Sequence, residues 1–105
     1  MRLRECNYGE LNGAAVEQVV ATRLDRIKIP FPDGESYLDV VRRTREFLGD
    51  LLRDHEGSRI LVIAHSANRW ALQHLLEGVP LADAISAAFA WQEGWEYALE
   101  RAAIL

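Results

Sequence analysis

The fold class of this chain is indicated most directly by RILVIAHSANRWALQHLLEG, residues 59–78. Its first part, Arg59 to Ala64, is an almost unbroken aliphatic and β-branched run, which is typical of a strand buried on both faces of a sheet. From Ser66 to Glu77 the apolar spacing favours a helix, and Gly78 is placed to end it. The stretch therefore predicts a buried strand that leads directly into a helix.

A longer helix is expected immediately upstream. From Tyr37 to Leu52 the apolar side chains recur at steps of three and four, which aligns them in one stripe opposite a charged face. Ser36 or Asp33 is expected to cap the start of this helix, and Gly57 follows its end. The order helix, buried strand, helix predicts an α/β fold with a parallel sheet.

The flanking segments are shorter and less regular. They are predicted as a loop, a short helix, a further helical turn and an edge hairpin, over residues 1–13, 14–24, 81–86 and 89–99 respectively. Residues 29–34 contain two prolines and a glycine, which exclude regular structure there. With no repeat and no interdomain linker, we expect residues 1–105 to form a single domain.

Composition restricts the classes of function. Half of the 105 residues are hydrophobic and 27% are charged, which is the balance of a folded domain. The net charge of −4 argues against a helical nucleic-acid binder or an anionic-membrane binder, since both need a basic surface. The single cysteine, Cys6, excludes an internal disulfide. The apolar run from Ile60 to Ala64, which no other run exceeds, is too short to span a bilayer. We expect a cytoplasmic protein with no membrane or nucleic-acid partner.

His65 is the residue best placed for chemistry. It would end the buried strand and precede a helix, and ligands of parallel α/β folds lie at the carboxyl ends of strands. The start of a helix offers free N–H groups and a positive dipole end, which favour an anion such as phosphate. A structural, hydrogen-bonded histidine is the alternative, and position alone leaves both open. The histidines and Cys6 show no metal-ligand spacing, so no metal site is expected.

Four blocks of the sequence, in this order, resemble histidine phosphatases of the phosphoglycerate mutase-like superfamily. They are LRECNYGELNG at 3–13, PDGESYLDVVRR at 32–43, ILVIAHSANRWALQHLLEG at 60–78 and WQEGWEYAL at 91–99. The resemblance implies the C-terminal part of a three-layer α/β sandwich with a parallel sheet. It also implies hydrolysis of phosphomonoesters, or phosphoryl transfer, through a phosphohistidine, without a cofactor. The expected ligand is phosphate or a phosphorylated small molecule.

The same resemblance implies roles for individual residues. Glu5 matches the general acid that protonates the leaving oxygen, and His65 matches the histidine that holds the transferring phosphoryl group. Tyr8 is expected to line the mouth of the substrate site. Ser66 and Arg69, which follow His65, are expected to contact the substrate phosphate.

Two further residues have open or minor roles. The family pattern places an arginine one position after Arg69, where this chain has Trp70, so a surface position is the alternative for Arg69. Glu35 belongs to the expected helix start and is assigned to capping rather than catalysis.

Two parts of the family mechanism have no match in this chain. One is the arginine-histidine-glycine segment that carries the nucleophile, since none of His55, His65 and His74 precedes a glycine. The other is a serine-x-x-arginine-alanine segment. We therefore expect a chain that is inactive alone, with a non-catalytic oligomerising or binding remnant as the rival. A truncated gene product, an expressed piece and half of a split enzyme all remain open, as do the substrate and the choice between phosphatase and mutase.

The absence of the family's N-terminal strand from this sequence leads to a prediction about assembly. A buried strand without its neighbour leaves an open edge, and such edges recruit other chains. We expect a homodimer or higher oligomer, or a partner chain that supplies the N-terminal half.

Overall fold

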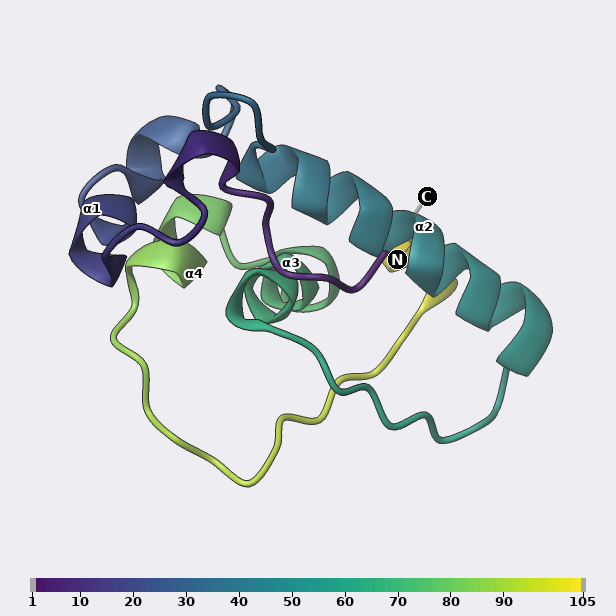
Figure 1. Ribbon diagram of the computed structural model, residues 1–105. Coiled ribbons are helices and arrows are strands. Elements are labelled where there is room, and N and C mark those ends of the chain that lie inside the picture. The colour runs from purple at the N-terminus through teal and green to yellow at the C-terminus, as the bar shows by residue number, and fades with distance from the viewer. Residues whose placement is uncertain (1, 105) are drawn as a thin grey trace.

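The computed structural model describes residues 2–104, with only the backbone of Ala103. Its elements, in chain order, are η1 (Gly9–Leu11), α1 (Val16–Val20), η2 (Arg23–Arg26), α2 (Tyr37–His55), α3 (Ser66–Glu77), α4 (Leu81–Ser86) and η3 (Arg101–Ile104). All of these elements are helical. Figure 1 shows α2 lying across the molecule, with α3 beneath it seen almost end-on and α1 and α4 gathered near the first turns of α2.

The long helix α2 forms where the sequence predicts it, and Ser36 is its cap. The Asp39 N–H donates to Ser36 Oγ at 3.1 Å, and the Ser36 N–H donates to Asp39 Oδ2 at 2.8 Å. This reciprocal pair satisfies donors that the first turn of a helix otherwise leaves open. The buried stripe of α2 includes Tyr37, Val40, Val41, Leu48 and Leu52, as the periodicity predicted.

The helix α3 covers this stripe. It begins at Ser66 and ends at Glu77, where Gly78 adopts a left-handed conformation with φ of 71°, and both limits agree with the sequence. The Tyr37 and Trp70 rings meet edge to face, with centroids 5.6 Å apart. The predicted helical turn at 81–86 is confirmed as α4, which packs against α3. The predicted helix at 14–24 is shorter, since α1 covers only five residues.

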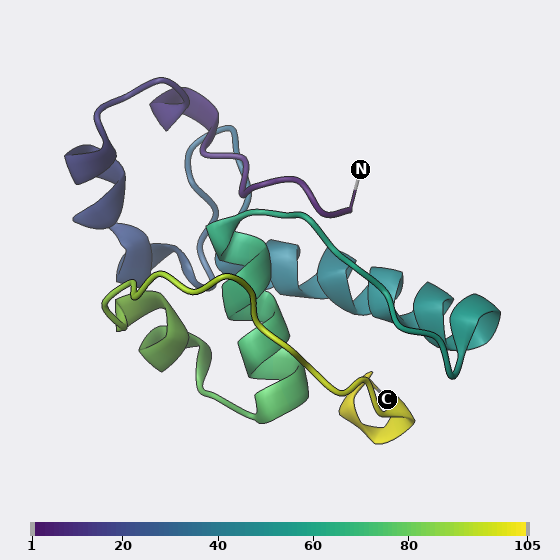
Figure 2. The ribbon, with the colours of Figure 1, turned by 90° about the horizontal axis from the view of Figure 1, so that it is seen from below.

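The predicted buried strand is wrong for this structure. Residues 59–64 form no strand, and the side chains of Ile60, Leu61 and Ile63 are 45%, 87% and 88% exposed. Figure 2 shows the segment as an irregular connection from the end of α2 back to α3. A strand needs a neighbour for its backbone N–H and C=O groups, and no backbone hydrogen bond joins residues 59–64 to the rest of 2–104. The part of the chain that the structure describes is therefore not a parallel three-layer sandwich.

The predicted hairpin at 89–99 is also wrong, for a related reason. An isolated two-stranded hairpin is marginally stable unless it joins a larger sheet or packs on a helix. Residues 87–100 form no strand, and Phe89 and Trp91 are 63% and 75% exposed. Within residues 2–104, no helix is long and apolar enough to cross a membrane.

Candidate functional site

The N-terminal segment, residues 2–5, is fixed to α2 by the buried side chain of Arg43. Its Nη1 donates to the carbonyl oxygens of Arg2 and Arg4 at 2.7 and 2.8 Å, and its Nη2 donates to that of Glu5 at 3.1 Å. The remaining donors form a two-pronged pair with the Glu35 carboxylate, at 2.9 and 3.0 Å. All five guanidinium N–H donors are thereby satisfied, which is the geometry in which a buried arginine is most strongly held.

The structure gives Glu35 a different role from the capping that the sequence suggested. Capping is performed by Ser36 and Asp39, while Glu35 accepts from Arg43 and from the Asn7 N–H at 2.9 Å. Burial alone would raise the pKa of Glu35, but the hydrogen bonds from Arg43 and Asn7 outweigh it, so that this pKa is lowered. Glu35 therefore remains ionised at neutral pH and anchors the segment that precedes Tyr8.

Asn68 joins this N-terminal segment to His65. It lies fully buried in the first turn of α3. The His65 N–H donates to Asn68 Oδ1 at 3.0 Å, and Asn68 Nδ2 donates to the Arg4 carbonyl oxygen at 3.1 Å. The carbonyl of Arg4 thus receives donors from both α2 and α3, and Glu5 follows directly in the chain. The sequence reasoning missed Asn68, although its place three residues after a helix cap was a detectable signal.

His65 and Ser66 lie at the exposed start of α3. His65 is the cap residue, with extended backbone angles of φ −118° and ψ 175°, and Ser66 is the first helical residue. Both side chains are exposed. This places their backbone at the positive end of a twelve-residue helix, where N–H groups favour an anion.

Arg69 contacts aromatic side chains of the C-terminal segment. Its guanidinium carbon lies 4.9 Å from the ring centre of Trp95 and 5.7 Å from that of Phe89. Such cation–π contacts stabilise a partly buried arginine. The contact explains how residues 87–100 are held across α3 without a strand, and the proposed contact of Arg69 with phosphate stays a prediction.

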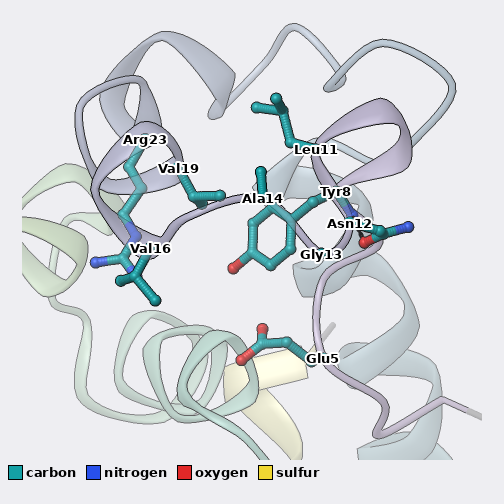
Figure 3. A pocket seen from close by; sticks show the side chains of 9 residues that line it. All are labelled: Glu5, Tyr8, Leu11, Asn12, Gly13, Ala14, Val16, Val19 and Arg23. Carbon is teal, nitrogen blue, oxygen red and sulfur yellow. Dashed lines mark hydrogen bonds between the residues drawn. The ribbon is translucent and has the colours of Figure 1, made fainter.

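Glu5 and Tyr8 line one open pocket of about 270 Å³ (Figure 3). The full lining consists of Glu5, Tyr8, Leu11, Asn12, Gly13, Ala14, Val16, Val19 and Arg23. His65, Ser66 and Arg69 do not line it. The structure therefore brings two of the five predicted site residues, Glu5 and Tyr8, together in a pocket. Through Asn68 it links the backbone of a third, His65, to that of Arg4, the neighbour of Glu5.

The side chains of Glu5 and Tyr8 are held by contacts with their neighbours. Glu5 Oε1 accepts the N–H of Cys6 at 2.7 Å. The Tyr8 ring packs edge-on against Phe31, with centroids 4.9 Å apart. Burial, followed by a hydrogen bond with the Tyr37 hydroxyl, raises the pKa of Tyr8, which therefore stays a neutral phenol.

A family model for the histidine phosphatase superfamily (branch 1) matches residues 1–92 of the chain. This chain belongs to the histidine phosphatase superfamily. The resemblance is thereby confirmed at the level of the family for the blocks at 3–13, 32–43 and 60–78, whereas the block at 91–99 lies mostly outside the matched residues.

One curated relative shows how much of a longer protein this chain matches. The protein named "Putative phosphoserine phosphatase 2" from Hydrogenobacter thermophilus is 31% identical over 88 residues, an alignment that covers 76% of this chain and 43% of the relative. The chain therefore spans less than half the length of the relative that it matches.

The cysteine of this histidine phosphatase chain is not a nucleophile candidate. Cys6 is 4% exposed. Burial, reinforced by the negative charges of Glu35 and Glu5, raises the pKa of its thiol to about 12, whereas a nucleophilic cysteine needs a thiolate. Among residues 2–104, no three histidine, cysteine or acidic side chains gather as a metal site would require.

Proposed function

We propose that this chain is the C-terminal part of a phosphohistidine-dependent phosphomonoesterase and is inactive by itself. In this proposal Glu5 is the general acid, and His65 holds the transferring phosphoryl group. Ser66 contributes its backbone N–H to the phosphate. The nucleophilic histidine comes from a segment that this chain does not contain.

The observation that supports the proposal best is the double hydrogen bond of Asn68. Asn68 bonds to the backbone of His65 and of Arg4, which are 61 positions apart in sequence, so it holds the two segments together. A general acid and a phosphate-binding histidine have to lie on either side of the same ester bond. The link through Asn68 between the backbone of Arg4 and that of His65 supports such an arrangement.

The proposed chemistry is a transfer through a covalent intermediate. The phosphorus–oxygen bond of the ester breaks as a bond to the absent histidine forms, and Glu5 gives its proton to the departing alcohol oxygen. His65 and the first N–H groups of α3 stabilise the charge on the phosphoryl oxygens. Water then attacks the phosphohistidine and releases inorganic phosphate.

The proposal extends to the missing layer of the fold. Residues 60–64 are apolar and mostly exposed, and residues 59–64 have no backbone partner within 2–104. We propose that they join a parallel sheet of a three-layer sandwich when the other half is present. That half comes from a second copy in a homodimer or higher oligomer, or from a partner chain. The relative, more than twice as long as the matched region, supports a larger complete protein.

A non-catalytic binding remnant is the second candidate. The exposure of Leu61, Ile63 and Trp91 favours it, since exposed apolar side chains of this kind mark interaction surfaces. The two candidates differ in one requirement, because the enzyme needs a partner with an arginine-histidine-glycine segment and the remnant does not.

The experiment follows phosphate binding through the three imidazoles of the chain. Inorganic phosphate is titrated to millimolar concentration while the Cε1–H NMR signals of His65, His55 and His74 are recorded. The proposal expects a saturable shift of His65 only, because His55 ends α2 and the His74 ring bonds to the Val79 carbonyl oxygen at 2.9 Å.

Variants complete this experiment. His65→Ala should abolish the saturable binding, and Asn68→Ala should weaken it, whereas His55→Ala should leave it unchanged. The isolated chain should show at most trace hydrolysis of an aryl phosphate. Equal shifts of all three histidines, no shift at all, or robust turnover would contradict the proposal.

A further inference from the structure

We infer that Trp95 and Phe89 are positioning residues of the phosphate site, because they hold the Arg69 guanidinium where it can bind the phosphoryl group. The inference rests on the proposed function, since it takes the phosphate to lie beside His65. It gives a role to two aromatic side chains of the segment 87–100, which forms no strand in this structure.

The first step concerns how Arg69 is held. Its guanidinium carbon lies 4.9 Å from the centre of the Trp95 ring and 5.7 Å from that of Phe89. The two rings also contact each other, with centroids 6.2 Å apart and an angle of 50° between their planes. The three side chains form one group, the Arg69 cluster, in which the rings restrict the positions that the long arginine side chain can adopt.

The second step concerns the hydrogen-bond donors of Arg69. Within residues 2–104 the guanidinium contacts these two rings but forms no hydrogen bond or ion pair. An aromatic ring attracts the positive charge without supplying a lone pair, so the N–H donors still lack an acceptor. Phosphate oxygens are acceptors that match the planar fork of a guanidinium. The Arg69 cluster therefore presents a held cation whose donors are available to an anion.

Other arginines of the described chain that contact an aromatic ring provide a comparison, because each of them also has a polar partner. The partners are the Asp50 carboxylate for Arg2, the Tyr37 hydroxyl for Arg23 and the Pro30 carbonyl oxygen for Arg26. Within residues 2–104, Arg69 differs from all three in having ring contacts alone. Its charge is therefore the one that remains to be paired by a ligand.

The third step concerns the place of Arg69 relative to His65. The Arg69 N–H donates to the His65 carbonyl oxygen at 3.1 Å, so the two residues share one face of the first turn of α3. Side chains of a helix lean towards its N-terminus, and that of Arg69 therefore leans towards His65 and Ser66. The guanidinium and the His65 imidazole can thus approach one phosphoryl group from the same side.

The fourth step concerns the segment that supplies the rings. It crosses α3 on its way from α4 to η3 (Figure 2), and no backbone hydrogen bond joins residues 88–99 to the rest of 2–104. Side-chain contacts hold it instead, through the Arg69 cluster and through Leu99, which packs against the hydrophobic core. Phosphate affinity should therefore depend on Trp95 but not on Trp91, which is 75% exposed in the same segment.

The test measures phosphate affinity for the full 105-residue chain and its variants. Inorganic phosphate is titrated while the His65 Cε1–H and Arg69 Nε–H NMR signals are followed. Arg69→Gln should weaken binding about tenfold, because a charge-assisted contact is lost. Trp95→Leu should weaken it about threefold, because one cation–π contact is lost. Trp95→Phe should retain most of the affinity, and Trp91→Leu, the matched control, should bind as the wild type does.

A double-mutant cycle distinguishes positioning from a general loss of stability. In the Arg69→Gln background, Trp95→Leu should cost little further affinity, because its effect passes through Arg69. Additive losses in the folded variants would overturn the inference. Where circular dichroism shows that Trp95→Leu unfolds, Phe89→Leu takes its place in the cycle with the same expectation, since Phe89 is 63% exposed and its truncation removes little core.

The outcomes separate this inference from the proposed function. A saturable His65 response with an affinity that Trp95→Leu leaves unchanged overturns the inference and leaves the phosphatase proposal in place. A response of Arg69 that depends on Trp95, without any response of His65, supports the positioning role of the rings and counts against the phosphatase proposal. No response of either residue in the folded wild-type chain overturns both.

Discussion

Arg43 determines the position of Glu5 more directly than any neighbour of Glu5 in sequence. It donates to three backbone carbonyl groups of the N-terminal segment, those of Arg2, Arg4 and Glu5. Its own guanidinium is paired with the Glu35 carboxylate. A loop without regular structure would otherwise leave Glu5, the proposed general acid, poorly placed. The chain thus uses one buried side chain on α2 in place of a backbone ladder.

The first prediction concerns the substitution Arg43→Ala. It removes the two shortest hydrogen bonds of a cation to the partly buried Glu35 carboxylate and leaves the carbonyl groups of Arg2 and Glu5 without this donor, so the free energy of unfolding should fall by about 3 kcal/mol. Arg42→Ala is the matched control, since Arg42 is exposed and pairs with Asp39 at the surface, where a pair contributes less than about 1 kcal/mol. Urea unfolding measures both. Equal losses for the two variants would show that the Arg43 network does not hold the segment.

The second prediction concerns acid. The pKa of Glu35 lies below its ordinary value of 4.5, so its stabilising contribution is present above pH 4.5 and is lost as the pH falls through the lowered folded value. Glu35→Gln should therefore be less stable than wild type at neutral pH and lose less on acidification. Urea unfolding between pH 7 and pH 3 gives the two slopes. Parallel slopes would contradict the assignment.

At the scale of elements, the helices were predictable and the strands were not. The signals of α2 and α3 are local, since the apolar stripe, the Ser36 cap and Gly78 lie within each helix or next to it. The run from Arg59 to Ala64 has the composition of a strand, but strand formation depends on neighbours that residues 2–104 do not provide. Sequence composition can indicate a strand without showing whether its partners are present.

The residues of the candidate site also differ in whether local sequence indicates them. Glu5, Tyr8 and His65 were proposed from short motifs, and their catalytic roles stay predictions. The contributions of Arg43 and Asn68 were missed, because they depend on contacts between segments that are distant in sequence.

The third prediction tests the cap of α2. Ser36→Ala removes the acceptor of the Asp39 N–H and should cost about 1 kcal/mol of unfolding free energy. Ser58→Ala, outside any helix, is the control and should change little. Thermal unfolding followed by circular dichroism compares them. A change for Ser58→Ala as large as that for Ser36→Ala would argue against the cap.

At the scale of the whole molecule, apolar side chains remain on the outside of the two long connections. Leu61 and Ile63 are 87% and 88% exposed, and Phe89 and Trp91 are more than half exposed. Contact with another protein surface would remove this apolar area from water, which is favourable.

The fourth prediction is therefore self-association. The chain should sediment as a dimer or larger species at micromolar concentration, and the double substitution Leu61→Lys and Ile63→Lys should shift it towards monomer. Leu24→Lys is the control, because Leu24 is also exposed, at 56%, but lies in η2. A wild-type chain that stays monomeric throughout this range would refute the expectation.

Because the backbone of residues 59–64 makes no hydrogen bonds within 2–104, this segment should be sensitive to proteolysis. An exposed segment without backbone hydrogen bonds fits readily into a protease cleft, and Arg59 offers a tryptic bond there. A cut would separate the chain into fragments that carry α2 and α3, yet the buried contact of Tyr37 with Trp70 lies across that division. The nicked molecule would keep its fold while losing its covalent continuity. The rate of cleavage at Arg59 would then report directly on whether another chain covers this segment.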